Sequence, residues 1–257
     1  MNMKKQLLFL VMMLLPIIAS ADAVEIDGIY YNLNTKARVA EVTSNPNNYT
    51  GTVVIPESVT YQDMNYSVTR IGDNAFRYCT GLTSVTIPNN VTTIGASAFS
   101  YCSGLSLVII PNSVTSIEGS AFCWCLGLTS ITIPNSVASI GAYAFDTCSG
   151  LTSITIGNNV TYIGIDAFYG CSALNAVHIY DLEAWCKIQF YDDTQNPLSL
   201  AHNLYLNGEE VKNLVIPNSV SNIESFSFSG CSGLTSVTIP NSVTNNFQYF
   251  GVFYNRA

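Results

Sequence analysis

The sequence predicts a solenoid, in which short coils of chain stack on one another, and three observations lead to this fold class. A block of 23 residues, at 128–150, recurs on both sides of itself with few changes. Repetition with a fixed period of about 20–50 residues is typical of solenoids. Apolar residues keep their places from copy to copy, and one copy alone is too short to bury them. We therefore expect each coil to be stabilised mainly by its two neighbours.

Each period is predicted to contain two extended segments and a closing turn. Ile131 and Ile133 alternate with Thr132, as in a strand with one buried face, and Pro134 ends the strand because it cannot donate to a sheet. The second segment and a short helical turn bury the remaining apolar residues, which are Val137, Ile140, Ala144, Phe145 and Cys148. Stacking of equivalent segments then gives a parallel strand ladder.

Composition argues against several other classes of protein. The chain has 257 residues, of which 48% are hydrophobic and 10% charged, against a usual charged share of about 25%. Disordered chains combine low hydrophobicity with high charge, so this chain is expected to fold. The net charge is −8 and no basic patch is interleaved with aromatic residues. Nucleic acid is therefore not an expected partner.

Residues 1–23 are predicted to be a secretory signal peptide. Lys4 and Lys5 precede an apolar run at 7–18, and small residues then offer cleavage sites ending at Ala21 or Ala23. The alternative is a membrane anchor, but the run is shorter than the roughly 20 residues that a bilayer requires. We therefore expect an exported protein, secreted or at the cell surface, with no transmembrane segment after signal removal.

The mature chain is predicted to fall into five parts. These are an N-terminal β-hairpin cap at 24–49, repeats at 50–173, a degenerate repeat with an insertion at 174–210, repeats at 211–243 and an atypical tail at 244–257. The hairpin is expected from β-forming segments at 25–33 and 37–42. Extra residues at 61–67 predict a protruding turn, and Asn207-Gly208 predicts a second hairpin. The aromatic tail either caps the last coil or marks a truncated chain.

The repeat pattern L-x-x-V/I-x-I-P-x-x-V-x-x-I-G-x-x-A-F-x-x-C resembles the BspA-like leucine-rich repeat proteins. The segment IDGIYYNL and the insertion DLEAWCKIQF…NPLSLAHNLYLNGE are similar to pieces of that family. The resemblance, which covers residues 25 to about 243, implies a leucine-rich-repeat solenoid from a bacterial surface or secreted protein. Some members are described as adhesins that bind host extracellular proteins or mediate co-aggregation. The family has no fixed binding residues that could be carried over to this chain.

The cysteines are expected to form a buried column of free thiols. Six recur in register with the period: Cys79, Cys102, Cys125, Cys148, Cys171 and Cys231. Stacked equivalents would lie close enough for a disulfide, but side chains in a ladder point the same way rather than at each other. Cys123 and Cys186 lie off this column, and a bridge that involves either of them stays open. Cys123 is expected to be exposed.

No enzyme, metal or cofactor is predicted. Cys123-x-Cys125 has no matching second pair, and His178 and His202 are isolated, so a metal site is not expected. Cys186 and His202 could be written as a nucleophile and its base, but no recognisable signature surrounds them. Packing of Trp185 and Cys186 into the core is the simpler interpretation.

Two surfaces hold the candidate ligand-binding residues. The insertion combines aromatic with acidic side chains: Tyr180, Asp181, Glu183, Tyr191, Asp192, Asp193 and Tyr205. The strands align hydroxyl residues at Thr86, Thr132 and Thr155. Insertions in repeat proteins tend to map to a binding face, although this one could equally be a spacer. Threonine also has a high β propensity, so the aligned hydroxyl residues could reflect strand formation on an exposed face rather than ligand binding.

Together these features predict an exported, non-catalytic scaffold that binds an extracellular protein or glycoprotein. A bacterial surface adhesin that contacts host proteins or other cells is the most specific form of this hypothesis. The alternatives are a carbohydrate-binding repeat module and a truncated fragment of a longer surface protein.

Overall fold

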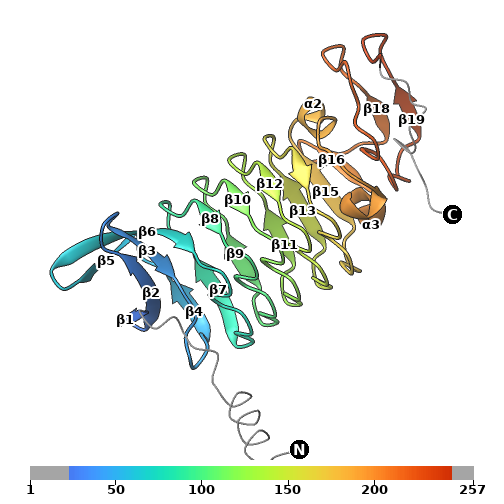
Figure 1. Ribbon diagram of the computed structural model, residues 1–257. Coiled ribbons are helices and arrows are strands. Elements are labelled where there is room, and N and C mark those ends of the chain that lie inside the picture. The colour runs from blue at the N-terminus through green and yellow to red at the C-terminus, as the bar shows by residue number, and fades with distance from the viewer. Residues whose placement is uncertain (1–22, 245–257) are drawn as a thin grey trace, which may run out of the picture.

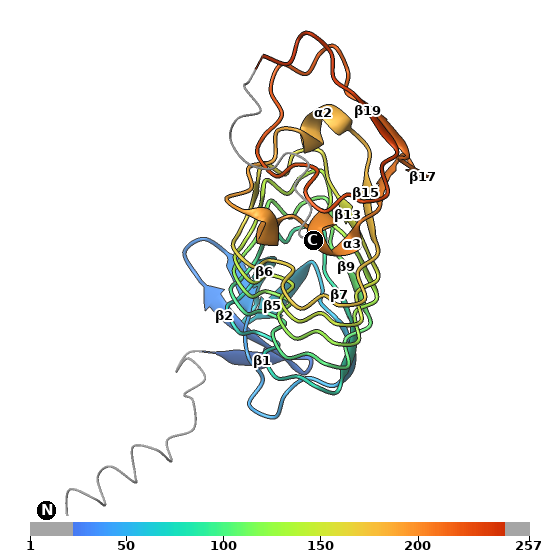
Figure 2. The same ribbon diagram turned by 90° about the vertical axis from the view of Figure 1, so that its right-hand side faces the viewer.

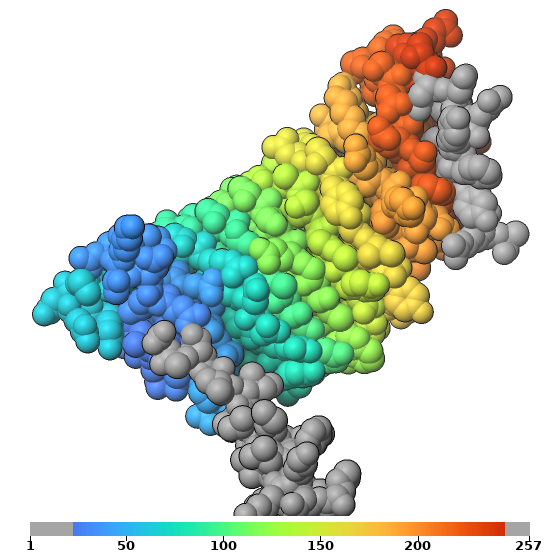
Figure 3. Space-filling model, viewed as in Figure 1, coloured from blue at the N-terminus to red at the C-terminus, as the bar shows by residue number. Residues whose placement is uncertain are grey.

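The structure, a computed structural model, describes residues 23–244. The predicted signal peptide lies outside the described residues except for Ala23, as does the predicted tail except for Thr244. The chain forms a β-solenoid of about seven turns with a period of about 23 residues, which confirms the predicted fold class (Figure 1). The coils pack into a continuous body from the N-terminal strands to β15 (Figure 3).

Two columns of parallel strands run the length of the body. The first column consists of β4 (Gly51–Val54), β7 (Leu82–Thr86), β9 (Leu107–Ile109), β11 (Ser130–Thr132), β13 (Ser153–Ile156), β15 (Ala176–Ile179) and β16 (Leu204–Leu206). The second column consists of β6 (Met64–Ile71), β8 (Thr93–Ile94), β10 (Ser116–Ile117), β12 (Ser139–Ile140) and β14 (Tyr162–Ile163). Along β11 and the residue that follows it, Ile131 and Ile133 are buried and Thr132 is exposed, as the alternation predicts.

The N-terminal cap is an antiparallel meander that continues the second column. Its strands are β1 (Val24–Ile26), β2 (Ile29–Asn34) and β3 (Val39–Val42), and β3 pairs in parallel with β6. The predicted hairpin is present as β2 and β3. Asp27 and Gly28, with φ of 51° and 81°, add a tight turn that splits its first segment into two strands. Arg70 ties the cap to the coils, because its guanidinium lies 2.8 Å from Glu41 and 3.3 Å from Glu118.

The extra residues of the first coil form a β-hairpin. Strand β5 (Ser58–Tyr61) pairs with the start of β6, and Gln62 and Asp63 form the connecting turn. The predicted protrusion at 61–67 is therefore an extension of the second column.

The closing turns stack their aromatic rings into what we call the phenylalanine column. Its members are Phe76, Phe99, Phe122, Phe145 and Phe168, all fully buried. Successive ring centroids are 4.9 to 5.5 Å apart, with interplanar angles of 6° or less. Backbone hydrogen bonds join the turns of neighbouring coils, such as Phe145 N–H to Ala167 O at 2.8 Å. Tyr49 covers the first ring at 4.7 Å.

The cysteine column lies beside these rings and consists of free thiols, as predicted. All eight cysteines fall within residues 23–244, and none is bridged there. The Cys148 thiol donates to Phe122 O, in the preceding coil, at 3.1 Å. The thiols of Cys102, Cys125 and Cys171 likewise each donate to a phenylalanine carbonyl of the preceding coil. The predicted exposure of Cys123 is wrong, because only 8% of it is exposed. Ser100, at the same place in the preceding coil, is also buried, whereas Tyr169 at this place in a later coil is 64% exposed, so burial at this position differs from coil to coil.

Glycine in the repeat permits close approach between coils. A Cβ atom built on Gly141 would lie 2.5 Å from the Gly119 nitrogen of the preceding coil. Such a contact is far inside van der Waals distance, so any other residue would push the coils apart. Gly141 is therefore explained by packing between coils.

The insertion adds helical turns and ends the first column. Its elements are α2 (Leu182–Trp185), η1 (Asp193–Gln195), α3 (Leu198–Ala201) and β17 (Glu209–Glu210). Trp185 and Cys186 are buried, as predicted, and the Trp185 indole N–H donates to Ser227 O at 2.8 Å. Asn207 and Gly208 join β16 to β17 in the predicted antiparallel hairpin. Because β17 lies along the edge of β16, the ladder cannot continue there.

The last described coils form a separate two-stranded sheet of β18 (Asn213–Val215) and β19 (Ser236–Thr238). Figure 2, which looks nearly along the stack, shows that this sheet lies off the axis of the other coils. No coil follows β19 among residues 23–244. Val237 is therefore 39% exposed, whereas the equivalent Ile131 is 3% exposed.

Candidate ligand-binding surfaces

The outward side of the first strand column carries aliphatic, hydroxyl and aromatic side chains. We call it the strand face, and its central row is Val54, Thr86, Ile109, Thr132, Thr155, His178 and Tyr205. Strand pairing sets Thr86 beside Ile109, and Thr132 beside Thr155. The predicted threonine alignment is thus present but interrupted, and Ile109 is 68% exposed in the middle of it. His178 and Tyr205 end the row as stacked rings 4.7 Å apart.

A break in the sheet divides the strand face. The hydrogen-bonded order β4-β7-β9 ends at β9, and a new order begins at β11. Leu107 and Ile109 on β9 stand where β11 carries Ser130 and Thr132, and Leu107 is 55% exposed. The change from hydroxyl to aliphatic side chains therefore coincides with the break.

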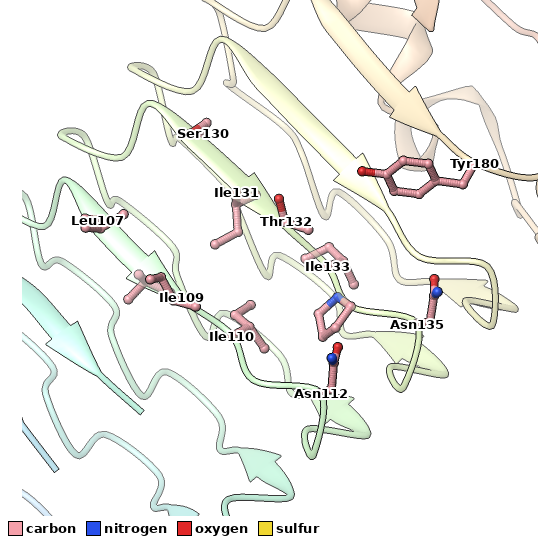
Figure 4. A pocket seen from close by; sticks show the side chains of 12 residues that line it. Leu107, Ile109, Ile110, Asn112, Ser130, Ile131, Thr132, Ile133, Asn135 and Tyr180 are labelled. Carbon is pink, nitrogen blue, oxygen red and sulfur yellow. The ribbon is translucent and has the colours of Figure 1, made fainter. Parts of the chain in front are cut away.

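A groove of about 380 Å³ lies at this break. Leu107, Ile109, Ser130 and Thr132 line it from the two strands, and Asn112 and Asn135 lie at its edge. Tyr180, from the end of β15, completes the lining, and its ring points back along the stack over β13 (Figure 4). Among residues 23–244, no charged side chain lines the groove. The floor of the groove is aliphatic, and its rim carries hydroxyl and amide groups. Such a groove suits an apolar group of a ligand that also makes polar contacts at the rim.

The insertion residues do not form one patch. Tyr180 lies at the groove, and Tyr205 lies on the strand face. Tyr191 is 86% exposed, but it follows Gln189, which bridges to Tyr162 of the second column. The structure therefore brings together Tyr180 and Thr132 and leaves Tyr191, Asp192 and Asp193 on a different part of the coil.

The predicted acidic residues of the insertion have local partners. The Asp181 carboxylate caps α2 by accepting from the N–H groups of Glu183 and Ala184 at 2.8 and 3.1 Å. Glu183 pairs with Lys187 at 2.7 Å, and this contact lowers the pKa of Glu183. The Asp192 carboxylate caps η1 through the Thr194 N–H at 2.9 Å. Ligand binding by these carboxylates stays a prediction, and it would compete with their capping bonds.

A second row of exposed aromatic side chains lies on the closing turns. Tyr78, Tyr101 and Trp124 precede the column cysteines of three successive coils and stack at 4.8 and 5.6 Å between ring centroids. Sequence reasoning missed this aromatic ladder, as it missed Leu107 and Ile109. The signal was available in both cases, since these residues vary at fixed positions of the repeat.

The sequence profile of the BspA type leucine rich repeat region matches residues 53–195 and 199–255, in six copies. The chain belongs to the BspA type leucine-rich repeat family. The family resemblance seen in the sequence is therefore confirmed. No curated protein matches the chain.

Solved leucine-rich repeat proteins of bacteria are similar to this family member. One from T. pallidum is 24% identical, covers 83% of this chain and 80% of its own, and has a TM-score of 0.56. One from Bacteroides ovatus is 25% identical, with coverages of 90% and 78% and a TM-score of 0.48. One from Bacteroides capillosus is 30% identical, with coverages of 52% and 98% and a TM-score of 0.45. The likeness to the first of these shows the solenoid fold.

Members of the BspA type family are generally protein-interaction scaffolds and typically non-catalytic. The family is described as one of bacterial surface proteins. Within residues 23–244, no helix has the length and apolar character to cross a bilayer. The conceivable nucleophile Cys186 is fully buried, and burial raises the pKa of its thiol to about 12. Its conceivable partner His202 binds Gly230 O through Nδ1 at 2.8 Å.

Proposed function

We propose that this family member is an exported, non-catalytic scaffold that binds an extracellular protein or glycoprotein through its strand face. The groove between β9 and β11 carries the proposal, because it is an uncharged hollow beside the exposed Leu107 and Ile109. Exposed aliphatic side chains of this size, gathered at a hollow, mark interaction sites on soluble proteins. An adhesin that contacts host proteins or other cells is the form of this function that the family favours.

The contact is expected to centre on the groove. An apolar side chain of the partner would displace water from Leu107 and Ile109, which contributes about 25 cal/mol per Å² of apolar surface. The Asn112 and Asn135 amides and the Thr132 hydroxyl supply hydrogen-bond donors and acceptors at the rim. Such a division between an apolar centre and a polar rim is typical of protein interfaces.

The test exchanges the groove residues for those of the next coil. The double variant Leu107→Ser/Ile109→Thr copies Ser130 and Thr132, which the fold already accepts at the same positions. Binding of residues 24–257 to a panel of host matrix proteins and whole bacteria is measured by surface plasmon resonance and adhesion assays. We expect the double variant to bind about 10- to 100-fold more weakly, as loss of a central apolar anchor does.

The matched control is Val54→Thr, which removes an equally exposed aliphatic residue from the same row outside the groove. It should leave the affinity within a factor of two or so, since peripheral contacts contribute little. Equal affinities for the double variant and the wild type would contradict the proposal. So would an absence of binding to every protein and cell in the panel.

A further inference from the structure

The aromatic ladder of Tyr78, Tyr101 and Trp124 stops in the middle of a regular stack. These residues have φ of 62–63°, so the three coils present their rings from the same backbone conformation. The Arg77 guanidinium lies over the first ring, 4.8 Å from its centroid. The next positions along the stack are Thr147 and Gly170, which have no ring to offer.

The backbone continues past the point where the ladder ends. Trp124 N–H donates to Asp146 O at 2.8 Å, and Thr147 N–H donates to Tyr169 O at 2.6 Å. The coils therefore keep their spacing, and only the side chains change. One face of the Trp124 indole stacks on Tyr101, and the smaller Thr147 stands at the next position of the ladder. Trp124 is 41% exposed, and Tyr101, its neighbour in the ladder, is partly buried.

We propose that the opposite face of the Trp124 indole is a stacking site for a pyranose ring of a neutral glycan. A bound ring would lie where the fourth member of the ladder is missing, about 5 Å along the stack, which is the spacing of stacked aromatic rings. The C–H groups on one side of a pyranose suit the electron-rich face of an indole, and its hydroxyls point outward to polar neighbours. The site is separate from the strand face and does not depend on it.

The polar groups beside Trp124 favour a sugar over an aromatic side chain. The Asp146 carboxylate accepts from the Thr147 hydroxyl at 2.9 Å and faces the Cys123 sulfur at 3.4 Å. A carboxylate has about four acceptor positions, so two remain for ligand hydroxyls. An apolar ring placed against this carboxylate would displace water and supply no hydrogen-bond donor in its place, which costs free energy.

The charge of the chain favours a neutral ligand. The net charge of the chain is −8. Sialylated or sulfated glycans would meet the Asp146 carboxylate and this negative field. Neutral glucans and mannans would not.

Intrinsic fluorescence gives a direct test, because the chain has only two tryptophans. Trp185 is 1% exposed and Trp124 is 41% exposed. Residues 24–257 are titrated with maltohexaose, cellohexaose and mannohexaose, and binding is measured in parallel by calorimetry. We expect a saturable blue shift of the emission with at least one of them, at a Kd of about 0.1–1 mM. That range corresponds to a binding free energy of about 4–5.5 kcal/mol.

Two variants separate the stacking site from a general loss of structure. Trp124→Ala removes the face, and binding should fall at least tenfold. Thr147→Tyr continues the ladder. Tyr78 and Tyr101 occupy the same position of the repeat with φ of 63° and 62°, close to the φ of 55° at Thr147, so a tyrosine fits the backbone there. It should cover the indole and abolish binding while the melting temperature stays equal or rises. Unchanged glycan affinity in either variant would overturn the proposal, as would binding to none of the three hexasaccharides.

Discussion

The phenylalanine column and the strand face are built from the same repeat, yet one is continuous and the other is broken. The column stacks without interruption from Tyr49 to Phe168. The strand face breaks between β9 and β11, and the ladder ends again at β17. The coils stay in register across the first break, where the closing turns and the second strand column both continue. Register between coils therefore does not depend on unbroken pairing in the first column. The strands are then free to vary at their outward positions.

The largest expected effect tests the column as the source of stability. Phe122→Ala removes a fully buried ring between two stacked neighbours. We expect the free energy of unfolding to fall by about 3–5 kcal/mol, as for other large-to-small core changes. Urea denaturation followed by circular dichroism gives the value.

Tyr169→Ala is the matched control, because it removes an exposed ring from the same turns. It should cost about 0.5 kcal/mol or less. Similar losses in the two variants would contradict the division between an architectural column and a variable surface.

The buried thiols predict a loss of stability at alkaline pH. Burial raises the pKa of Cys231 to about 11 and that of Cys186 to about 12, from an ordinary value of 9.0. Above pH 9 the unfolded chain therefore loses thiol protons that the folded chain keeps. The free energy of unfolding falls as pH rises, by up to about 1.4 kcal/mol per pH unit for each such thiol, until the folded pKa is reached.

Urea midpoints measured between pH 8 and pH 10.5 check this slope. Cys186→Ala should make the slope shallower by one thiol's share without changing its sign. A midpoint that is constant across this range would show that the thiols ionise equally in the folded and unfolded chains.

A smaller effect is expected from the thiol hydrogen bonds of the cysteine column. Cys148 donates to Phe122 O across the coil boundary, in a fully buried position. Cys148→Ser replaces a weakly polar thiol with a hydroxyl in an apolar site, which costs about 1–3 kcal/mol. Thr147→Ser, at the adjacent partly exposed position, serves as the control in the same denaturation experiment. A serine variant as stable as the wild type would show that this column tolerates polar groups.

The sequence predicts the regular parts of this molecule because they depend on local patterns repeated many times. Phe145 and Cys148 recur with the period, so the stacked coils and the buried column of free thiols follow from the repeat. Asn207-Gly208 favours a tight turn by its residue types, so the second hairpin follows from those two residues. The break between β9 and β11 does not follow in this way. Leu107 and Ile109 have good β propensity, and whether β9 pairs with β11 depends on packing between coils.

The candidate site is predicted less completely for the same reason. Tyr180 and Thr132 were both singled out, but 48 positions separate them in the chain, and only the stacked coils bring them to one groove. The prediction for Cys123 is wrong because it rests on the residues at the same position in other copies of the repeat, such as Ser100 and Asp146, which are polar. The burial of Cys123 is instead determined by the coils on either side of it. Features within a coil are readable from the repeat, and features between coils require the structure.

The smallest expected effect on stability, and the sharpest test of the strand face, comes from Tyr180→Ser. Tyr180 is 57% exposed and lies beyond the last residue of β15, so its loss should change the free energy of unfolding by about 0.5 kcal/mol or less. Its ring nevertheless lines the groove beside β11. If the partner enters this groove, affinity should fall about tenfold while stability is unchanged. Tyr191→Ser, which removes the more exposed tyrosine of the same insertion away from the groove, should leave affinity unchanged. If Tyr191→Ser lowered affinity and Tyr180→Ser did not, the partner would bind near the second column and not at the strand face.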